Sequence, residues 1–129
     1  MKRQAEFHPE WVISLFEEKD LRASTSLINT GWCMQWAYMA WLMFEDVELF
    51  SVPGHAFIRY HGKYYDSERL NGVDHWLDLP TNQWMGLGLG EIYPLPPDEF
   101  RARWNPWGKC YDFSSHWKYW EFLVENFCR

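Results

Sequence analysis

The chain has 129 residues, of which 47% are hydrophobic and 20% aromatic, including ten tryptophans. This is enough apolar material to close one core, so we expect a single domain over residues 1–129. Acids outnumber bases 18 to 12, for a net charge of -6. Because nucleic-acid affinity comes from Lys and Arg at the phosphates, this balance argues against a nucleic-acid partner.

The sequence gives no sign of secretion or membrane insertion. Residues 1–6 are mostly charged or polar, and no apolar run of signal-peptide length follows them. The longest apolar run, about Trp36–Phe44, is too short to span a bilayer. The three cysteines, Cys33, Cys110 and Cys128, are an odd number at irregular spacing, which favours a reducing cytoplasm over a disulfide framework. A Cys110–Cys128 pair stays open as an alternative.

The first half of the chain predicts two helices. Residues Glu10–Leu21 carry apolar side chains with charged ones between them, a pattern that favours a short surface helix. A polar stretch follows, in which Asn29 or Thr30 can cap the next helix. The segment Cys33–Phe44 is apolar on nearly every side. A helix of this kind needs neighbours all around it, so we expect a central helix with Cys33 in its first turn.

A hairpin is predicted directly after this helix and a connection that ends at Pro53-Gly54. The strand His55–Tyr60 turns at His61-Gly62 into a second strand, Lys63–Glu68. A two-residue turn of the primed kind needs positive φ at both central residues, which Gly adopts freely and His adopts more readily than most residues. The sequence therefore predicts a tight turn at His61-Gly62.

The length of the turn sets the register of the hairpin. The expected cross-strand pairs are Tyr60 with Lys63, Arg59 with Tyr64, Ile58 with Tyr65, Phe57 with Asp66 and His55 with Glu68. In this register His55 and Asp66 are diagonal neighbours, about 7 to 8 Å apart at the backbone, which their side chains can bridge. Glu68 lies directly opposite His55 and is the alternative partner.

The second half of the chain gives weaker signals. We expect one helical turn within Leu70–Leu79, loops at Gly86–Gly90 and Pro94–Pro97, and a strand at Glu91–Tyr93. The last segment has apolar residues at helical spacing after Ser114 and Ser115, which predicts a closing amphipathic helix. The expected fold is α+β: the Cys33 helix packs on a small antiparallel sheet that contains the hairpin, with helices from both ends of the chain beside it.

Cys33, His55 and Asp66 are the candidate catalytic residues. The first turn of a helix offers free N–H groups and a partial positive charge, which favour a thiolate and can hold an oxyanion. His55 supplies the imidazole of a thiol–imidazole pair, and Asp66 fixes the ring tautomer and favours the imidazolium. Further candidates for an oxyanion donor, among which the sequence does not choose, are Asn29, Trp32 and Gln35.

Three sequence blocks carry a family resemblance. They are Gly31-Trp32-Cys33 at the helix start, Gly54-His55-Ala56-Phe57 at the strand start, and Gly62-Lys63-Tyr64-Tyr65-Asp66 in the hairpin. In order and context the blocks resemble the papain-like cysteine hydrolase superfamily, and within it the transglutaminase-like core most closely. The resemblance implies a Cys-His-Asp triad and cleavage, deamidation or acyl transfer at an amide or ester carbonyl through a thioester. It implies a protein or peptide substrate and no cofactor.

A metal site and a non-catalytic binding function are the two competing interpretations. A metal site is not predicted, because the spacing of its possible ligands matches no usual zinc pattern; these ligands are His55, His61, Asp66, Asp74 and His75. The remaining alternative is a compact acidic protein-binding module, an inhibitor or adaptor that keeps a hydrolase-like core without turnover. A Cys33 sulfur within reach of a His55 nitrogen favours the enzyme, whereas a sealed Cys33 favours the binding module. The oligomeric state is not predicted.

Overall fold

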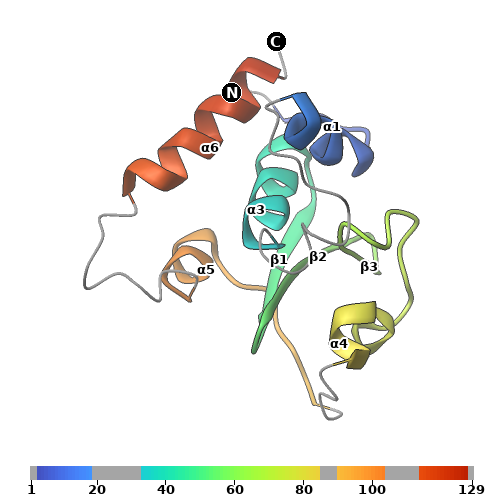
Figure 1. Cartoon of the computed structure of the whole chain (residues 1–129). Coiled ribbons are helices and arrows are strands. Elements are labelled where there is room, and N and C mark those ends of the chain that lie inside the picture. Colours follow the sequence, from blue (N-terminus) through green and yellow to red (C-terminus); the bar gives the residue numbers. More distant parts are fainter. Residues whose placement is uncertain (1–2, 19–32, 85–89, 104–113, 128–129) are drawn as a thin grey trace.

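The computed structural model describes residues 3–18, 33–84, 90–103 and 114–127 (Figure 1). Helices and one antiparallel sheet form an α+β fold, as predicted. The elements in chain order are α1 (Glu10–Glu18), α3 (Cys33–Met43), β1 (Val47–Val52), β2 (His55–Tyr60), β3 (Lys63–Tyr65), the 3-10 helix η1 (Trp76–Asp78), α4 (Pro80–Trp84), α5 (Pro97–Arg103) and α6 (Ser114–Phe127). No helix in these ranges is long and apolar enough to cross a membrane.

The hairpin formed by β2 and β3 has the predicted turn and register. Its cross-strand pairs are Tyr60 with Lys63, Arg59 with Tyr64 and Ile58 with Tyr65. At the turn, His61 has φ 45° and Gly62 has φ 83°, the positive values that a primed two-residue turn requires. Beyond Tyr65 the expected pairing is wrong, because β3 ends there and the chain turns away at Asp66.

The sheet has the order β1-β2-β3, and β1 was not predicted. Residues 47–52, expected to be a connection, pair along their whole length with β2 around a Pro53-Gly54 turn, where Gly54 has φ 84°. Leu49 and Phe50 are adjacent in sequence and are both buried, one on each face of the sheet. A strand covered on both faces lacks the alternation of apolar and polar residues that reveals a half-exposed strand.

Single backbone pairs partly cover both outer strands of the sheet. On the β1 side, the Leu95 N–H donates to the Leu49 carbonyl at 2.8 Å. On the β3 side, Tyr64 and Val73 exchange two N–H to carbonyl bonds, both of 2.9 Å. The predicted strand at Glu91–Tyr93 is therefore wrong, since those residues are irregular and the pairing occurs at Leu95. Each pair satisfies edge groups that would otherwise be exposed.

The predicted helices at both ends of the chain and around Cys33 are confirmed. Helix α1 lies within the range expected for the first helix, and α6 begins at the predicted capping residue Ser114. The expected turn of helix in 70–79 is η1. Helices α4 and α5 are not among the predicted elements. Helix α5 begins at Pro97, within the predicted loop Pro94–Pro97, because Pro suits the first position of a helix. Predictions that lie outside the described residues concern Asn29, Thr30, residues 86–89, Cys110 and Cys128.

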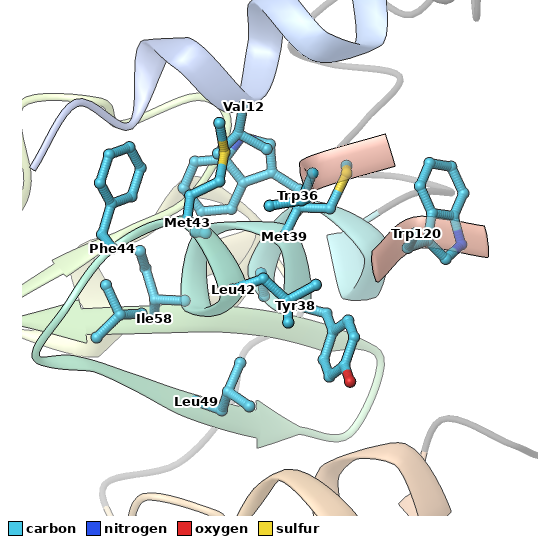
Figure 2. Close-up of a cluster of buried hydrophobic side chains, with 14 of the residues drawn as sticks. Val12, Trp36, Tyr38, Met39, Leu42, Met43, Phe44, Leu49, Ile58 and Trp120 are labelled. Atoms are coloured by element: carbon cyan, nitrogen blue, oxygen red, sulfur yellow. The ribbon is translucent and has the colours of Figure 1, made fainter. Parts of the chain in front are cut away.

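Helix α3 is the centre of the core, as its composition predicts. Its buried residues are Cys33, Gln35, Trp36, Ala37, Tyr38, Met39, Ala40, Leu42 and Met43. Figure 2 shows Leu49 and Ile58 reaching toward α3 from the sheet, with Val12 of α1 and Trp120 of α6 on its other sides. The helix is thus packed between the sheet and the two terminal helices.

The opposite face of the sheet has a smaller core of its own, near η1. Its buried members are Phe50, Val52, Phe57, Trp76 and Leu79. Because successive strand residues point to opposite faces, Phe50 and Phe57 face this cluster while Leu49 and Ile58 face α3. A bidentate ion pair lies on the same face of the sheet: Arg59 Nε and Nη2 donate to the Glu48 carboxylate at 2.8 and 2.9 Å.

A buried tyrosine joins α3 to two other helices. The Tyr38 hydroxyl donates to Glu121 of α6 at 2.8 Å and accepts from Arg101 of α5, also at 2.8 Å. Burial and the hydrogen bond to Glu121 raise the pKa of Tyr38 to about 12, against the opposing effect of Arg101. The phenol therefore stays neutral and can serve both partners at physiological pH.

Substitution of two phenylalanines, one in α5 and one in α6, tests whether α5 packs on the core. Phe100 of α5 is fully buried, whereas Phe122 of α6 is 60% exposed. We expect Phe100→Ala to lower the free energy of unfolding by about 3 to 5 kcal/mol, because it removes a buried ring and leaves a cavity. Phe122→Ala should change it by about 0.5 kcal/mol or less. Urea denaturation of both variants measures the difference, and equal losses would contradict the packing of α5 on the core.

Candidate active site

The three predicted catalytic residues stand at the ends of three elements. Cys33 is the first residue of α3, His55 is the first residue of β2, and Asp66 directly follows β3. The β2–β3 register places Tyr65, the last residue of β3, opposite Ile58, so the chain leaves β3 at Asp66 on the side toward His55. Helix α3 packs on the same sheet, with Cys33 in the core cluster that includes Ala56. His55 and Asp66 are joined by a hydrogen bond, and Cys33 is near enough to the His55 ring to affect its pKa.

His55 and Asp66 form a buried hydrogen-bonded pair. The distance from His55 Nε2 to Asp66 Oδ2 is 3.0 Å, and both side chains are 0% exposed. Glu68, the alternative partner, is half-buried, and its backbone N–H instead donates to Asp66 Oδ1 at 2.9 Å. Both carboxylate oxygens of Asp66 are thus bonded, which offsets the cost of burying a charge.

Cys33 is a neighbour of the His55 ring. Cys33 is a free thiol with 7% of its surface exposed. Because Nε2 is bonded to Asp66, Nδ1 is the ring atom that remains, and this buried atom has no hydrogen-bonding partner among the described residues. Cys33 is near enough to the ring to help raise the pKa of His55.

These neighbours determine the charge of His55. Burial lowers the pKa of His55, but the hydrogen bond to Asp66 and the interactions with Cys33 outweigh this effect and raise the pKa to about 9. The ring is therefore an imidazolium at neutral pH. A cation beside a thiol favours the thiolate, which is the nucleophilic form of cysteine.

A phenylalanine ring supports His55 from the neighbouring position on the same face of the sheet. The rings of His55 and Phe57 are nearly parallel, at 26°, with centroids 5.8 Å apart. Phe57 is itself fully buried in the smaller core. The sequence predicts both residues in one strand of the hairpin, but it gave Phe57 no part in the site. The signal was their spacing of two residues in a strand.

The predicted oxyanion donors are not brought to the site by the described structure. Asn29 and Trp32 lie outside the described residues. Gln35 is in the first turn of α3 and is buried. Residues two apart in a helix do not face each other, so Gln35 points to a different side of α3 from Cys33. The backbone N–H groups of the first turn remain the donors nearest to the sulfur in sequence.

His61 and His75 have local partners of their own. His61 lies at the hairpin turn, 3.3 Å from the Asp46 carboxylate, and His75 Nδ1 accepts from the Leu77 N–H at 3.1 Å at the start of η1. Within the described ranges, no three His, Cys, Asp or Glu side chains converge in a way that could hold a metal ion.

Comparison with known proteins gives no relative for this chain: no protein-family model matches it, and neither curated proteins nor solved structures give a match. The function is therefore inferred from the positions of Cys33, His55 and Asp66 and from the chemistry that they allow.

The raised pKa of His55 predicts how stability depends on pH. A group with a raised pKa in the folded state contributes stability that is complete below its ordinary pKa, here 6.5, and is lost as the pH rises through about 9. We expect the free energy of unfolding to fall by on the order of 3 kcal/mol over this interval.

Urea denaturation of the wild type and of His55→Gln at several pH values measures this contribution. The difference between the two proteins isolates His55 from other groups that titrate in the same interval. If both proteins lose stability equally between pH 6.5 and 9, the raised pKa of His55 is contradicted.

Proposed function

We propose that this protein is a cysteine-dependent hydrolase or acyltransferase of the papain-like superfamily, closest to its transglutaminase-like core. Cys33 is the nucleophile, His55 is the general acid and base, and Asp66 orients the ring. The observation that carries the proposal is the buried His55–Asp66 bond at Nε2, which leaves Nδ1 without a partner among the described residues, with Cys33 as a neighbour of the ring. The order of helix, hairpin and acid in the chain agrees with the resemblance.

In the first half of the reaction the acyl group moves to the sulfur. The Cys33 thiolate attacks the carbonyl carbon of an amide or ester, and the backbone N–H groups at the start of α3 stabilise the oxyanion. His55 Nδ1–H then gives its proton to the leaving amine or alcohol as the bond to the carbonyl carbon breaks. The products of this half are a thioester on Cys33, a neutral imidazole and the released amine or alcohol.

In the second half the acyl group leaves the sulfur. Water or an amine attacks the thioester carbon, and His55 Nδ1 takes up the proton that the attacking group loses. The carbon–sulfur bond breaks and restores the thiolate beside the imidazolium, with release of an acid or a new amide. Asp66 stays ionised throughout and keeps the second proton of the ring at Nε2, so that Nδ1 is always the atom that exchanges protons.

The burial of the site limits how a substrate approaches. Of the three residues, only Cys33 has any exposed surface, at 7%, while His55 and Asp66 have none. A carbonyl group must therefore approach from the side of the sulfur, which suits a protein or peptide segment presented to the start of α3. We place the protein in the cytoplasm, where reducing conditions keep Cys33 a thiol.

The low exposure of Cys33 also favours a second candidate, the non-catalytic binding module. In that case the Cys33, His55 and Asp66 cluster is a buried polar network without turnover. The two candidates differ in the reactivity of the sulfur toward a small electrophile.

Alkylation of Cys33 by iodoacetamide separates these candidates. At pH 6.5 we expect the wild type to react about tenfold or more faster than His55→Ala and Asp66→Asn, since both variants lose the imidazolium that favours the thiolate. The rate is measured by mass spectrometry of the peptide that contains Cys33, and Cys33→Ala removes that label.

His61→Asn is the matched control for the histidine variants. His61 is exposed at the hairpin turn, and Asn tolerates the positive φ found there. This variant should react at the wild-type rate. Equal alkylation rates in the wild type and in folded His55→Ala would contradict the proposed enzymatic function and support the binding module.

A further inference from the structure

The loop of residues 66–72 begins at the acid that holds His55 and closes on itself. Tyr64 and Val73 join its two ends through a pair of 2.9 Å backbone hydrogen bonds. Within the loop, Arg69 N–H donates to the Asp66 carbonyl at 3.1 Å, and Gly72 N–H donates to the Arg69 carbonyl at 3.2 Å. Two consecutive turns therefore bring the chain back beside β3.

Gly72 occupies a point in this loop where a side chain has no room. Its φ is 82°, a conformation that residues with a side chain rarely adopt. A Cβ atom at this position would lie 2.8 Å from Cε2 and Cζ of Tyr65 and 3.1 Å from its hydroxyl. Both the backbone conformation and the contact with Tyr65 require glycine.

The Tyr65 ring is not free to move away from Gly72. The residue is 9% exposed and belongs to the core around α3. Its ring packs edge-on against Phe7, with centroids 4.8 Å apart. Displacing the ring would open a void in a closely packed core. A larger residue at position 72 must therefore shift the loop backbone, the Tyr65 ring or both.

We propose that Gly72 is a positioning residue for the Asp66–His55 pair, because its missing side chain lets the loop close on Tyr65 and hold Asp66 at His55. Asp66 is the residue next to Tyr65 in the chain, and its carbonyl accepts the first hydrogen bond of the loop. A displacement of this loop is therefore passed to the Asp66 carboxylate. Hydrogen bonds weaken steeply with distance and angle, so a small displacement at Nε2 is sufficient to disturb the pair.

This inference rests on the proposed function only for its effect on Cys33, since the close approach of Gly72 to Tyr65 and the His55–Asp66 bond exist whether or not the protein is an enzyme.

The test is an NMR titration of the His55 ring in the wild type, Gly72→Ala and Gly62→Ala. Gly62 has φ 83°, and a Cβ added there would have nothing within 4 Å, so Gly62→Ala matches the backbone strain without the contact. We expect Gly72→Ala to lower the pKa of His55 by about one pH unit or more, and Gly62→Ala to leave it unchanged.

Two groups act on His55, namely Cys33 from α3 and Asp66 from the loop. Repeating the titration in a Cys33→Ala background removes the first group. Any difference in the His55 pKa that Gly72→Ala still causes in this background then comes through Asp66. If Gly72→Ala lowers stability but leaves the His55 titration at the wild-type value, or if both glycine variants shift it equally, the positioning role is overturned.

A second pair of variants covers the case in which Gly72→Ala does not fold. Tyr65→Leu removes the ring atoms that a Cβ at position 72 would meet. In the Tyr65→Leu background, adding Gly72→Ala should therefore cause no further fall in the His55 pKa. A further fall of the same size would contradict the proposed contact. Iodoacetamide alkylation of the wild type and His55→Ala tests the proposed function independently, since that comparison leaves Gly72 unchanged.

Discussion

The absence of a polar face on α3 is the constraint that organises the fold. An amphipathic helix can lie on a surface, whereas α3 must be covered on all sides, and the sheet, α1 and α6 provide that cover. The sheet is small, so it can cover only one side. Helices from the two ends of the chain complete the enclosure. Cys33 enters the core because it is the first residue of this helix.

The catalytic candidate follows from this enclosure together with the hairpin. Burial of a histidine and a carboxylate is unfavourable unless each finds hydrogen-bonding partners. Asp66 satisfies this condition through His55 and the Glu68 N–H, and His55 satisfies it at Nε2. The remaining atom, Nδ1, has no hydrogen-bonding partner among the described residues, and Cys33 is a neighbour of the ring. A polar group that the fold leaves unpaired beside a nucleophile is what proton exchange requires.

Local features were the ones that the sequence made predictable. The hairpin followed from the His61-Gly62 turn and from alternation, so the proximity of His55 and Asp66 was foreseeable. The choice between Asp66 and Glu68 was not, because strand pairing alone places Glu68 opposite His55, and the turn that starts at Asp66 overrides it. Strand β1 was missed because its apolar residues serve two cores at once. The links from Tyr38 to Arg101 and Glu121 span 63 and 83 residues, beyond the reach of local patterns.

The hydrogen bonds of Tyr38 determine the rotation of α3 about its axis, which apolar packing alone does not. A helix that is apolar on nearly every side buries similar area in many rotations about its own axis, so hydrophobic burial alone specifies its orientation weakly. Hydrogen bonds are directional, so the bonds of Tyr38 to Arg101 and Glu121 restrict the rotation of α3. Five residues of a helix separate Cys33 from Tyr38 by about 140° around the axis. The rotation of α3 that brings Tyr38 to Arg101 and Glu121 also holds Cys33 near the His55 ring.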